Sequence, residues 1–285
     1  MTTDRQAEID ARVSTAAQLE YWGKQSADDN GMLGGFPHLS RVDMQFSRNF
    51  LSKLHRLHPI SGDKRPASDD SVDRRTGQYA FRHCLESGAG IGRVTLNLLA
   101  SLCEKIDIIE PVEKFTATLT APGAPLVKSG QLQRVYNVPL QEWSAESIPS
   151  YDAANAVSAN PISDADRWKP STPLGEVTTE PGARYDLIWH QWCLDYLSSP
   201  DLVRYFRTLV PLLAPDGWII VKENISNAAD GEDMFWEEDK SVTHSDRNFR
   251  ACFEQAGLKI VRTKLQTGFP KTLLPVRMYA LRPAS

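Results

Sequence analysis

A glycine-rich turn constrains the fold of this chain more than any other feature of its sequence. The turn, 86–93 (ESGAGIGR), lies between a mostly apolar run at 80–85 and a helix-like run at 94–102, and a second apolar run at 106–109 ends on Glu110. A strand, a glycine turn, a helix and a second strand in this order form one unit of a parallel sheet. Glycine lets bare backbone approach a ligand, and an acid after the second strand can accept hydrogen bonds from ribose hydroxyls. The sequence therefore predicts a nucleoside-type cofactor at the edge of a parallel sheet.

The spacing of the glycines narrows the choice of cofactor. Dinucleotide sites use G-x-G-x-x-G, but here Arg93 stands where the third glycine would be. With Glu86 before the first glycine, the pattern E-x-G-x-G-x-G resembles motif I of S-adenosylmethionine-dependent methyltransferases. The alternatives are a nicotinamide or flavin enzyme, and a turn that only joins a strand to a helix. Glu110 follows Gly90 by 20 residues, a spacing expected for a ribose-binding acid, and this disfavours the second alternative.

Charge and composition exclude several classes of partner. The formal net charge of −4 gives no broad positive surface for nucleic acid or an anionic membrane, whereas it suits a positively charged substrate. No apolar run approaches the ~18 residues of a membrane span, and the first residues do not resemble a signal peptide. The four cysteines form no C-x-x-C pair, and no histidine pair has metal-ligand spacing. We therefore expect reduced, mostly buried thiols, no metal site and a cytoplasmic location.

Strand and helix patterns alternate along the second part of the chain. Nearly continuous apolar runs such as 217–223 suit buried parallel strands. The alternation predicts an α/β fold with a doubly wound, mostly parallel seven-stranded sheet of the Rossmann-like kind. The expected strands are 80–86, 105–110, 133–138, 185–190, 217–223, 258–266 and 275–282, and the expected later helices are 199–212 and 245–256.

The rest of the chain divides by composition. Residues 1–60 are expected to form an N-terminal helical extension, with helices at 6–24 and 43–57 around a glycine-rich loop at 31–40. Residues 61–77 are polar and charged, which is typical of a linker.

The domain that carries the sheet spans residues 78–285. Within it, 144–184 is rich in Pro, Ser, Ala and Asp and is long for a connection in a compact domain. We expect this segment to be a surface insertion.

Further motifs, in order along the chain, extend the resemblance. They are Tyr21-Trp22 with the loop NGMLGGF at 30–36, Leu140-Gln141, IWHQW at 188–192 and VKEN at 221–224. With the glycine turn, they resemble the protein α-N-terminal methyltransferases, a class I family that methylates the free α-amine of proteins beginning Xaa-Pro-Lys. The resemblance covers about residues 18–285, apart from the linker and much of the insertion. It implies S-adenosylmethionine as cofactor, protein or peptide N-termini as partners, a monomer, and a cytoplasmic protein that can also be nuclear.

The resemblance implies a set of cofactor contacts. Arg93 can pair with the cofactor carboxylate, and Glu110 can take the ribose hydroxyls. Leu140 would cover the adenine and Gln141 would bond its edge. Taken singly, Arg93 can be a solvated helix-start charge, Glu110 a surface acid and Leu140 a core residue. The expected cofactor residues are Gly88, Gly90, Arg93, Glu110, Leu140, Gln141 and Gln191.

The resemblance also implies an acceptor site. In the family, the tryptophan matching Trp192 packs beside the substrate proline, and the asparagine matching Asn224 binds its first residue. Asp239 aligns with an acid assigned to amine binding and deprotonation, and the acidic run 237–239 would attract the third-position lysine. Plain core tryptophans, a strand-end asparagine and a solvated acidic face are the alternatives. The expected acceptor residues are Trp22, Leu33, Gly34, Trp192, Tyr196, Glu237 and Glu238, with Asp239, Asn224 and Asp195 as catalytic candidates.

One position departs from the family. A Gly-His pair commonly follows I-W-x-Q-W, and its histidine is proposed as a second base, but Asp195 and Tyr196 stand there in this chain. A tyrosine with a reference pKa of about 10 is a poor base at neutral pH. Either Asp195 or Asp239 substitutes, or no strong base is needed, because deprotonating an α-amine of pKa roughly 7.7–8.0 at pH 7 costs only about 1 kcal/mol.

Two rival functions use the same cofactor site. One is a methyltransferase with a small-molecule or lysine acceptor, against which the G-M-L-G-G and Q-W motifs argue. The other is a protein that binds S-adenosylmethionine without turnover, for which Tyr196 is the support.

Overall fold

The computed structural model describes residues 3–58, 72–73, 78–121, 123–143, 172–173 and 185–284 of the 285-residue chain. Apart from the two-residue strands β1 (Val72–Asp73) and β6 (Thr172–Pro173), the expected linker at 61–77 and insertion at 144–184 lie outside the described residues. β1 pairs with β2 (Gln78–Tyr79) in a small antiparallel ribbon. The division of the chain into extension, linker and domain stays a prediction.

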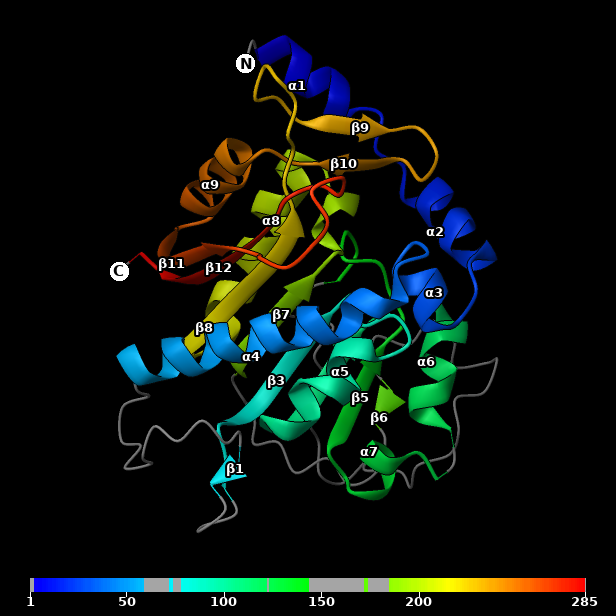
Figure 1. The fold of residues 1–285 in the computed structure, drawn as a ribbon, viewed down its shortest axis with the longest axis vertical. Coiled ribbons are helices and arrows are strands. Elements are labelled where there is room, and N and C mark those ends of the chain that lie inside the picture. Colours follow the sequence, from blue (N-terminus) through cyan, green and yellow to red (C-terminus); the bar gives the residue numbers. More distant parts are fainter. Residues whose placement is uncertain are drawn as a thin grey trace.

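A single mostly parallel sheet forms the centre of the molecule (Figure 1). Its strand order is β11-β12-β8-β7-β3-β4-β5-β6, with parallel pairing from β8 through β5 and antiparallel pairing at β11, β12 and β6. The seven-stranded, mostly parallel sheet expected from the sequence is therefore confirmed, and the short β6 adds an eighth strand at one edge. The seven long strands are β3 (Phe81–Ser87), β4 (Cys103–Ile109), β5 (Leu132–Tyr136), β7 (Tyr185–Gln191), β8 (Leu213–Asn224), β11 (Leu258–Leu265) and β12 (Val276–Pro283).

Helices cover both faces of this sheet, because alternate strand side chains feed two separate apolar clusters. On β7, Trp189 packs into one cluster with α4 (Ser40–Leu57) and α5 (Arg93–Asn97), and Ile188 packs into the other with α8 (Ser199–Leu209) and α9 (Asp246–Gln255). The helices α6 (Glu113–Thr120) and α7 (Pro125–Lys128) add Leu119 and Leu126 to the first cluster. This is the doubly wound arrangement that the alternating pattern predicts.

The N-terminal extension differs in one respect from the sequence prediction. The single helix expected at 6–24 is wrong, because the chain forms α1 (Thr3–Asp10) and α2 (Thr15–Lys24) instead. Ser14 lies between them in an extended conformation, with φ −139°, and its hydroxyl accepts a hydrogen bond from the amide of Ala17. A serine in that conformation caps a new helix and ends the previous one.

The glycine-rich loop and the second expected helix follow α2. The loop includes the short helices α3 (Asp29–Met32) and η1 (Pro37–Leu39). The helix expected at 43–57 is α4, which begins three residues earlier, at Ser40, and crosses β8, β7 and β3 in Figure 1.

A hairpin of β9 (Met234–Trp236) and β10 (Ser241–Thr243) carries the acidic run and lies beside α1 (Figure 1). Arg5 Nη1 lies 2.8 Å from Asp230 Oδ2, and Arg12 pairs with Glu237. These contacts hold the hairpin against the N-terminal segment. Among the described residues, none of the helices combines the length and the apolar character that a bilayer crossing requires.

Candidate active site

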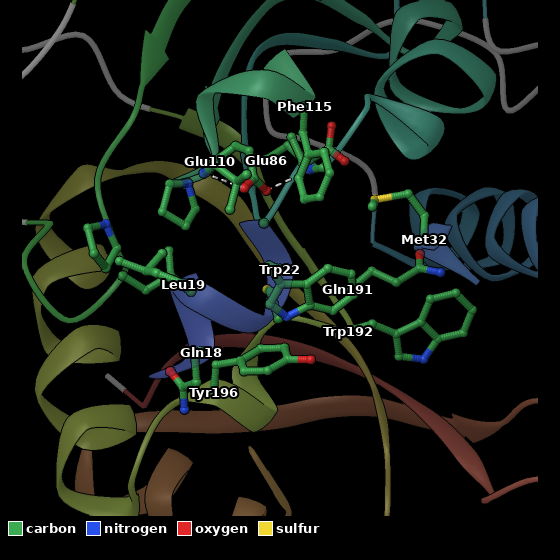
Figure 2. Close-up of a pocket in the computed structure, with 18 of the residues that line it drawn as sticks. Gln18, Leu19, Trp22, Met32, Glu86, Glu110, Phe115, Gln191, Trp192 and Tyr196 are labelled. Atoms are coloured by element: carbon green, nitrogen blue, oxygen red, sulfur yellow. Dashed lines mark hydrogen bonds between the residues drawn. The ribbon is translucent and has the colours of Figure 1, made fainter. Parts of the chain in front are cut away.

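A pocket lies where the carboxyl ends of the parallel strands β3, β4 and β7 meet, the usual place for a ligand in such a sheet (Figure 2). Its walls come from the glycine turn, from the segments after β4, β5 and β7, and from α2 and α3 of the N-terminal extension. The residues expected at the cofactor all line it: Gly88, Gly90, Arg93, Glu110, Leu140, Gln141 and Gln191.

The glycine turn requires glycine for two independent reasons. Gly88 and Gly90 have φ of +66° and +55°, in the left-handed region that other residues rarely adopt. A Cβ on Gly88 would lie 2.3 Å from Cβ of Cys193, and one on Gly90 would lie 2.8 Å from Sδ of Met32, a flexible side chain that can shift more easily. The turn is therefore packed directly against the segment after β7 and against α3.

Glu110 connects the end of β4 to the glycine turn. Its Oε2 accepts a hydrogen bond of 2.8 Å from the amide of Gly90, and its Oε1 accepts one of 2.8 Å from the amide of Val112. Burial raises the pKa of Glu110 to about 7. Each carboxylate oxygen can accept a second hydrogen bond, so both remain suited to a diol.

Glu86, which the sequence analysis used in the motif but did not count as a site residue, also lines the pocket. It is buried at the end of β3, and Thr95 Oγ1 donates a 2.6 Å hydrogen bond to its Oε2. Burial raises the pKa of Glu86 to about 8. The carboxyl group is therefore largely protonated at neutral pH in the absence of a ligand.

A buried acid that was not among the expected site residues lies behind the pocket. Asp43 on α4 is fully buried, and its Oδ2 accepts hydrogen bonds from Arg93 Nη1 at 2.6 Å and from Gln191 Nε2 at 2.8 Å. Its Oδ1 pairs with the ammonium of Lys222, which is also fully buried. Asp43 precedes Ser47, Phe50 and Leu54 at helical spacing on the buried side of α4, so extending that periodicity would have marked it.

Aromatic side chains form a wall of the pocket (Figure 2). Trp22 contacts Tyr196 and Phe115 edge to face, with ring centroids 5.9 Å and 6.2 Å apart. The hydroxyl of Tyr196 donates a 3.0 Å hydrogen bond to Oδ2 of Asp239. Burial raises the pKa of Tyr196 well above its usual range, so this hydroxyl keeps its proton.

Trp192, also in this wall, has a strained backbone with φ of +55°. Glu223, near the end of β8, stabilises the turn that follows Trp192, because its Oε1 accepts hydrogen bonds of 3.0 Å from the amides of Cys193 and Leu194. Such strain persists where the surrounding structure holds it, and it is often found at functional sites. The glutamate of K-E-N thus fixes the turn of Q-W, which sequence reasoning did not detect.

The remaining expected residues do not line the pocket. Asp239 reaches it only through Tyr196, and Glu237 pairs with Arg12 and Lys240 on the exposed hairpin. Asp195 is buried, and burial together with the negative charge of Glu223 raises its pKa well above the usual range. The others outside the lining are Leu33, Gly34, Asn224 and Glu238.

Other lining residues come from the N-terminal extension and from α6. Gln18 and Leu19 lie on the same helix as Trp22, and Met32 is the methionine of G-M-L-G-G. The helical spacing of Gln18 and Trp22 would have identified Gln18, since positions i and i+4 share a face. We find no comparable sequence signal for Phe115 on α6.

Known proteins resemble the chain over most of its length. The sequence profile of the family described as AdoMet dependent proline di-methyltransferase matches residues 10–154 and 167–282. The alpha N-terminal protein methyltransferase 1 of Schizosaccharomyces pombe is 32% identical over 269 residues, covering 94% of this chain and 95% of that protein. The N-terminal Xaa-Pro-Lys N-methyltransferase 1 of Xenopus tropicalis is 27% identical, covering 92% of each.

Solved structures of methyltransferases also share the fold of this chain. A SAM-dependent methyltransferase from Leishmania major has a TM-score of 0.64 and 27% sequence identity, and the match covers 94% of this chain and 82% of that one. A S-adenosylmethionine-dependent methyltransferase from Clostridium acetobutylicum shares the fold with a TM-score of 0.53 at 12% identity, over 90% of this chain and 99% of that one.

Proposed function

This chain belongs to the family of AdoMet-dependent proline di-methyltransferases, and from that premise we propose that it methylates the free α-amine of protein N-termini of the Xaa-Pro-Lys type. The methyl donor is S-adenosylmethionine, in agreement with the family and with the solved structures of the same fold. One observation carries the choice of acceptor. The profile match includes the N-terminal extension, and that extension supplies Trp22 to the aromatic wall of the pocket.

The side chains at the glycine turn fit this cofactor by their chemistry. When bound, S-adenosylmethionine supplies a methyl group on a positively charged sulfur. Arg93 offers a guanidinium for its carboxylate, and Glu110 offers carboxylate oxygens for its ribose hydroxyls. Leu140 and Gln141 line the pocket where the adenine would lie against an apolar side chain and an amide.

The aromatic wall fits a proline ring at the second position of the acceptor. Trp22, Trp192 and Tyr196 present flat apolar surfaces, on which a pyrrolidine ring can pack without losing a hydrogen bond. The hydrogen bonds from Glu223 fix the backbone after Trp192, so the Trp192 ring can make this contact from a fixed position. Leu33 and Gly34 stay within the proposal as contacts of the peptide, and Asn224 stays within it as a contact of the peptide's first residue.

The proton of the acceptor amine is taken, in our proposal, towards Asp239. The hydroxyl of Tyr196 lies between the pocket and Asp239 and donates to its carboxylate. Asp195 is a weaker candidate for the proton acceptor. Its raised pKa keeps its carboxyl group protonated to a higher pH than usual, and it does not line the pocket. Deprotonating the α-amine at pH 7 costs only about 1 kcal/mol. Most of the rate acceleration therefore comes from orienting the amine and excluding water.

A direct test compares a free and a blocked N-terminus. We expect a peptide beginning Ala-Pro-Lys to gain methyl groups from S-adenosylmethionine in mass spectrometry, and its N-acetylated form to gain none. Equal rates on the two peptides, or no transfer to the free one, would refute the proposal.

The acidic run gives a second test of the acceptor. Glu238 and Asp239 are proposed to attract the third-position lysine, with a lesser part for Glu237, whose carboxylate is already paired with Arg12 and Lys240. Replacing that lysine of the peptide by glutamate should raise KM strongly. An unchanged KM would remove the acidic run from substrate binding.

The same proposal includes a monomer in the cytoplasm or nucleus. The four cysteines are free and buried, as expected for a protein of a reducing compartment. Light scattering on the purified protein tests the monomer, and imaging of a tagged copy in cells tests the location.

A further inference from the structure

The buried acid behind the pocket contacts two pocket side chains at once. Asp43 Oδ2 accepts hydrogen bonds from Arg93 Nη1 at 2.6 Å and Gln191 Nε2 at 2.8 Å. Asp43 is fully buried and does not line the pocket, whereas Arg93 and Gln191 do. Asp43 therefore cannot touch a ligand itself, and any effect on a ligand must pass through these two residues.

The contact with Asp43 decides which way the Gln191 amide points. A carboxylate only accepts hydrogen bonds, so Gln191 must turn its NH₂ group towards Asp43 and its carbonyl oxygen away. That oxygen, Oε1, is buried and has no hydrogen-bond partner in the part of the chain that the structure describes. A buried acceptor without a partner destabilises the protein, and a donor on a ligand would remove this cost.

Arg93 is oriented in the same way. Both of its hydrogen bonds to the extension, to Asp43 at 2.6 Å and to Ser40 Oγ at 3.5 Å, come from Nη1. The guanidinium has donors on three nitrogens, so anchoring Nη1 on α4 leaves the remaining edge for a planar anion such as a carboxylate. Arg93 thus offers N–H donors to a ligand, and Gln191 offers a carbonyl oxygen as an acceptor.

The charges around Asp43 are unequal. Two cations, Arg93 and Lys222, contact this one carboxylate. Lys222 is fully buried, and burial lowers its pKa to about 8 even though Asp43 opposes the shift. A ligand carboxylate beside Arg93 would balance the second positive charge.

We propose that Asp43 is a positioning residue for the amino-acid end of the cofactor. It holds Arg93 for the cofactor carboxylate and turns Gln191 so that its carbonyl oxygen accepts from the cofactor ammonium. Lys222 provides a buried counter-charge beside the Asp43 carboxylate. Through this contact, α4 of the N-terminal extension determines how tightly the sheet domain binds the amino-acid end of the cofactor, independently of the adenosine end.

The test separates the two ends of the cofactor. S-adenosylhomocysteine carries the amino-acid group, and 5′-methylthioadenosine lacks it. Calorimetry measures the Kd of both, with weak binding of methylthioadenosine measured by its displacement of S-adenosylhomocysteine. The matched pair is Lys222→Met and Asp43→Asn/Lys222→Met, because both lack the buried ammonium and differ only in the carboxylate.

We expect the double variant to bind S-adenosylhomocysteine at least tenfold more weakly than Lys222→Met, with methylthioadenosine affinity within twofold. Equal weakening of both ligands would mean that Asp43 only supports the fold, and no weakening of either would mean that it positions nothing. Both results overturn the proposal. If the double variant does not fold, the test passes to Asp43→Glu, which keeps the charge but displaces the carboxylate, and the same selective loss is expected. The measurement uses no methyl acceptor, so it does not depend on the proposed substrate.

Discussion

The cofactor side and the acceptor side of the pocket are built by different kinds of chain segment. On the cofactor side, all seven expected residues line the pocket, and they lie at the end of β7 or in the segments that follow β3, β4 and β5. On the acceptor side, Trp22, Trp192 and Tyr196 are the three of ten expected residues that do so. A parallel sheet brings its strand ends together by construction, and Trp192 and Tyr196 follow β7. Trp22, in contrast, comes from α2, and the acidic run lies on the β9–β10 hairpin, and both segments dock from far along the chain.

The difference shows what a pattern of residues can predict. Residues after parallel strands are placed by the sheet, so identifying the strands also locates the site. Residues on docked segments are placed by contacts such as the Gln18 Nε2 bond of 2.9 Å to the carbonyl of Lys240, which no local pattern indicates.

The largest effect should come from a methyl group in the glycine turn. Gly88→Ala would place its Cβ 2.3 Å from Cβ of Cys193, so we expect loss of measurable cofactor binding. Overpacking of this kind also destabilises a core by about 1–3 kcal/mol. Calorimetry and urea unfolding measure the two effects.

Gly130→Ala is the matched control for that variant. Gly130 has a similar φ of +69°, but a Cβ there would meet nothing within 4 Å. It should show only the cost of left-handed backbone, about 1–2 kcal/mol, with cofactor affinity unchanged. Similar behaviour of the two variants would contradict the close packing of the turn.

An acceptor-side variant should leave cofactor binding intact and slow methyl transfer. Tyr196→Phe keeps the ring that contacts Trp22 and removes the hydroxyl that donates to Asp239. We expect kcat on an Ala-Pro-Lys peptide to fall about five- to tenfold at pH 7, because deprotonating the α-amine there costs about 1 kcal/mol. Above the amine pKa of about 8 the deficit should shrink, because the neutral amine then needs no proton acceptor.

Asp239→Asn should show the same pH profile, and the double variant should be no slower than Asp239→Asn alone. A deficit of constant size between pH 6 and pH 9 would mean that Tyr196 acts only by packing.

A smaller effect is expected from the buried acid under the turn. The folded-state pKa of Glu86 is raised to about 8 from a usual 4.5, so the folded protein binds more protons between these values and loses stability as the pH rises. Glu86→Gln removes this loss and can still accept from Thr95. Its Tm should exceed that of the wild type at pH 8 by a few degrees, at about 2–4 °C per kcal/mol, and the two should converge near pH 4.5.

Glu104→Gln, at an exposed acid of β4, is the control for Glu86→Gln. Its Tm should stay close to that of the wild type at both pH values. A Glu86→Gln variant that is less stable than the wild type at pH 8 would contradict the protonated state of Glu86.

The smallest effect should follow from Glu237→Gln. Its carboxylate is exposed and pairs with Arg12 and Lys240, away from the pocket. We expect kcat/KM on the peptide within twofold of the wild type, whereas Glu238→Gln should have the larger effect because that acid has more freedom to meet the substrate. The reverse order, measured in the same peptide assay, would show that the hairpin is arranged differently when substrate is bound.

The fold was predictable because its signals are local and repeated. Apolar strand runs alternate with helical patterns, and each strand expected from 80–86 onward is found within a few residues of its expected bounds. The error at 6–24 arose because the apolar spacing continues through Ser14, although a serine there caps a new helix.

The site was predictable only in part. The lining position of Arg93 follows from the motif, but its anchor, Asp43, lies 50 residues away on another helix. Glu223 on the neighbouring strand β8 stabilises the turn in which Trp192 has its positive φ. This contact can be located only when the register of β7 and β8 is known. Sequence patterns therefore did not indicate the contacts between segments whose relative positions depend on tertiary packing.

The central claim, that the acceptor is the α-amine of a protein N-terminus, is tested most directly by locating the methyl group. A peptide beginning Ala-Pro-Lys contains an α-amine and a lysine ε-amine, whose deprotonation at pH 7 costs about 1 and about 4.6 kcal/mol. Tandem mass spectrometry of the product at early time points distinguishes the two nitrogens. Methyl groups confined to the α-nitrogen are the predicted result, and methyl groups on the lysine side chain would contradict the account.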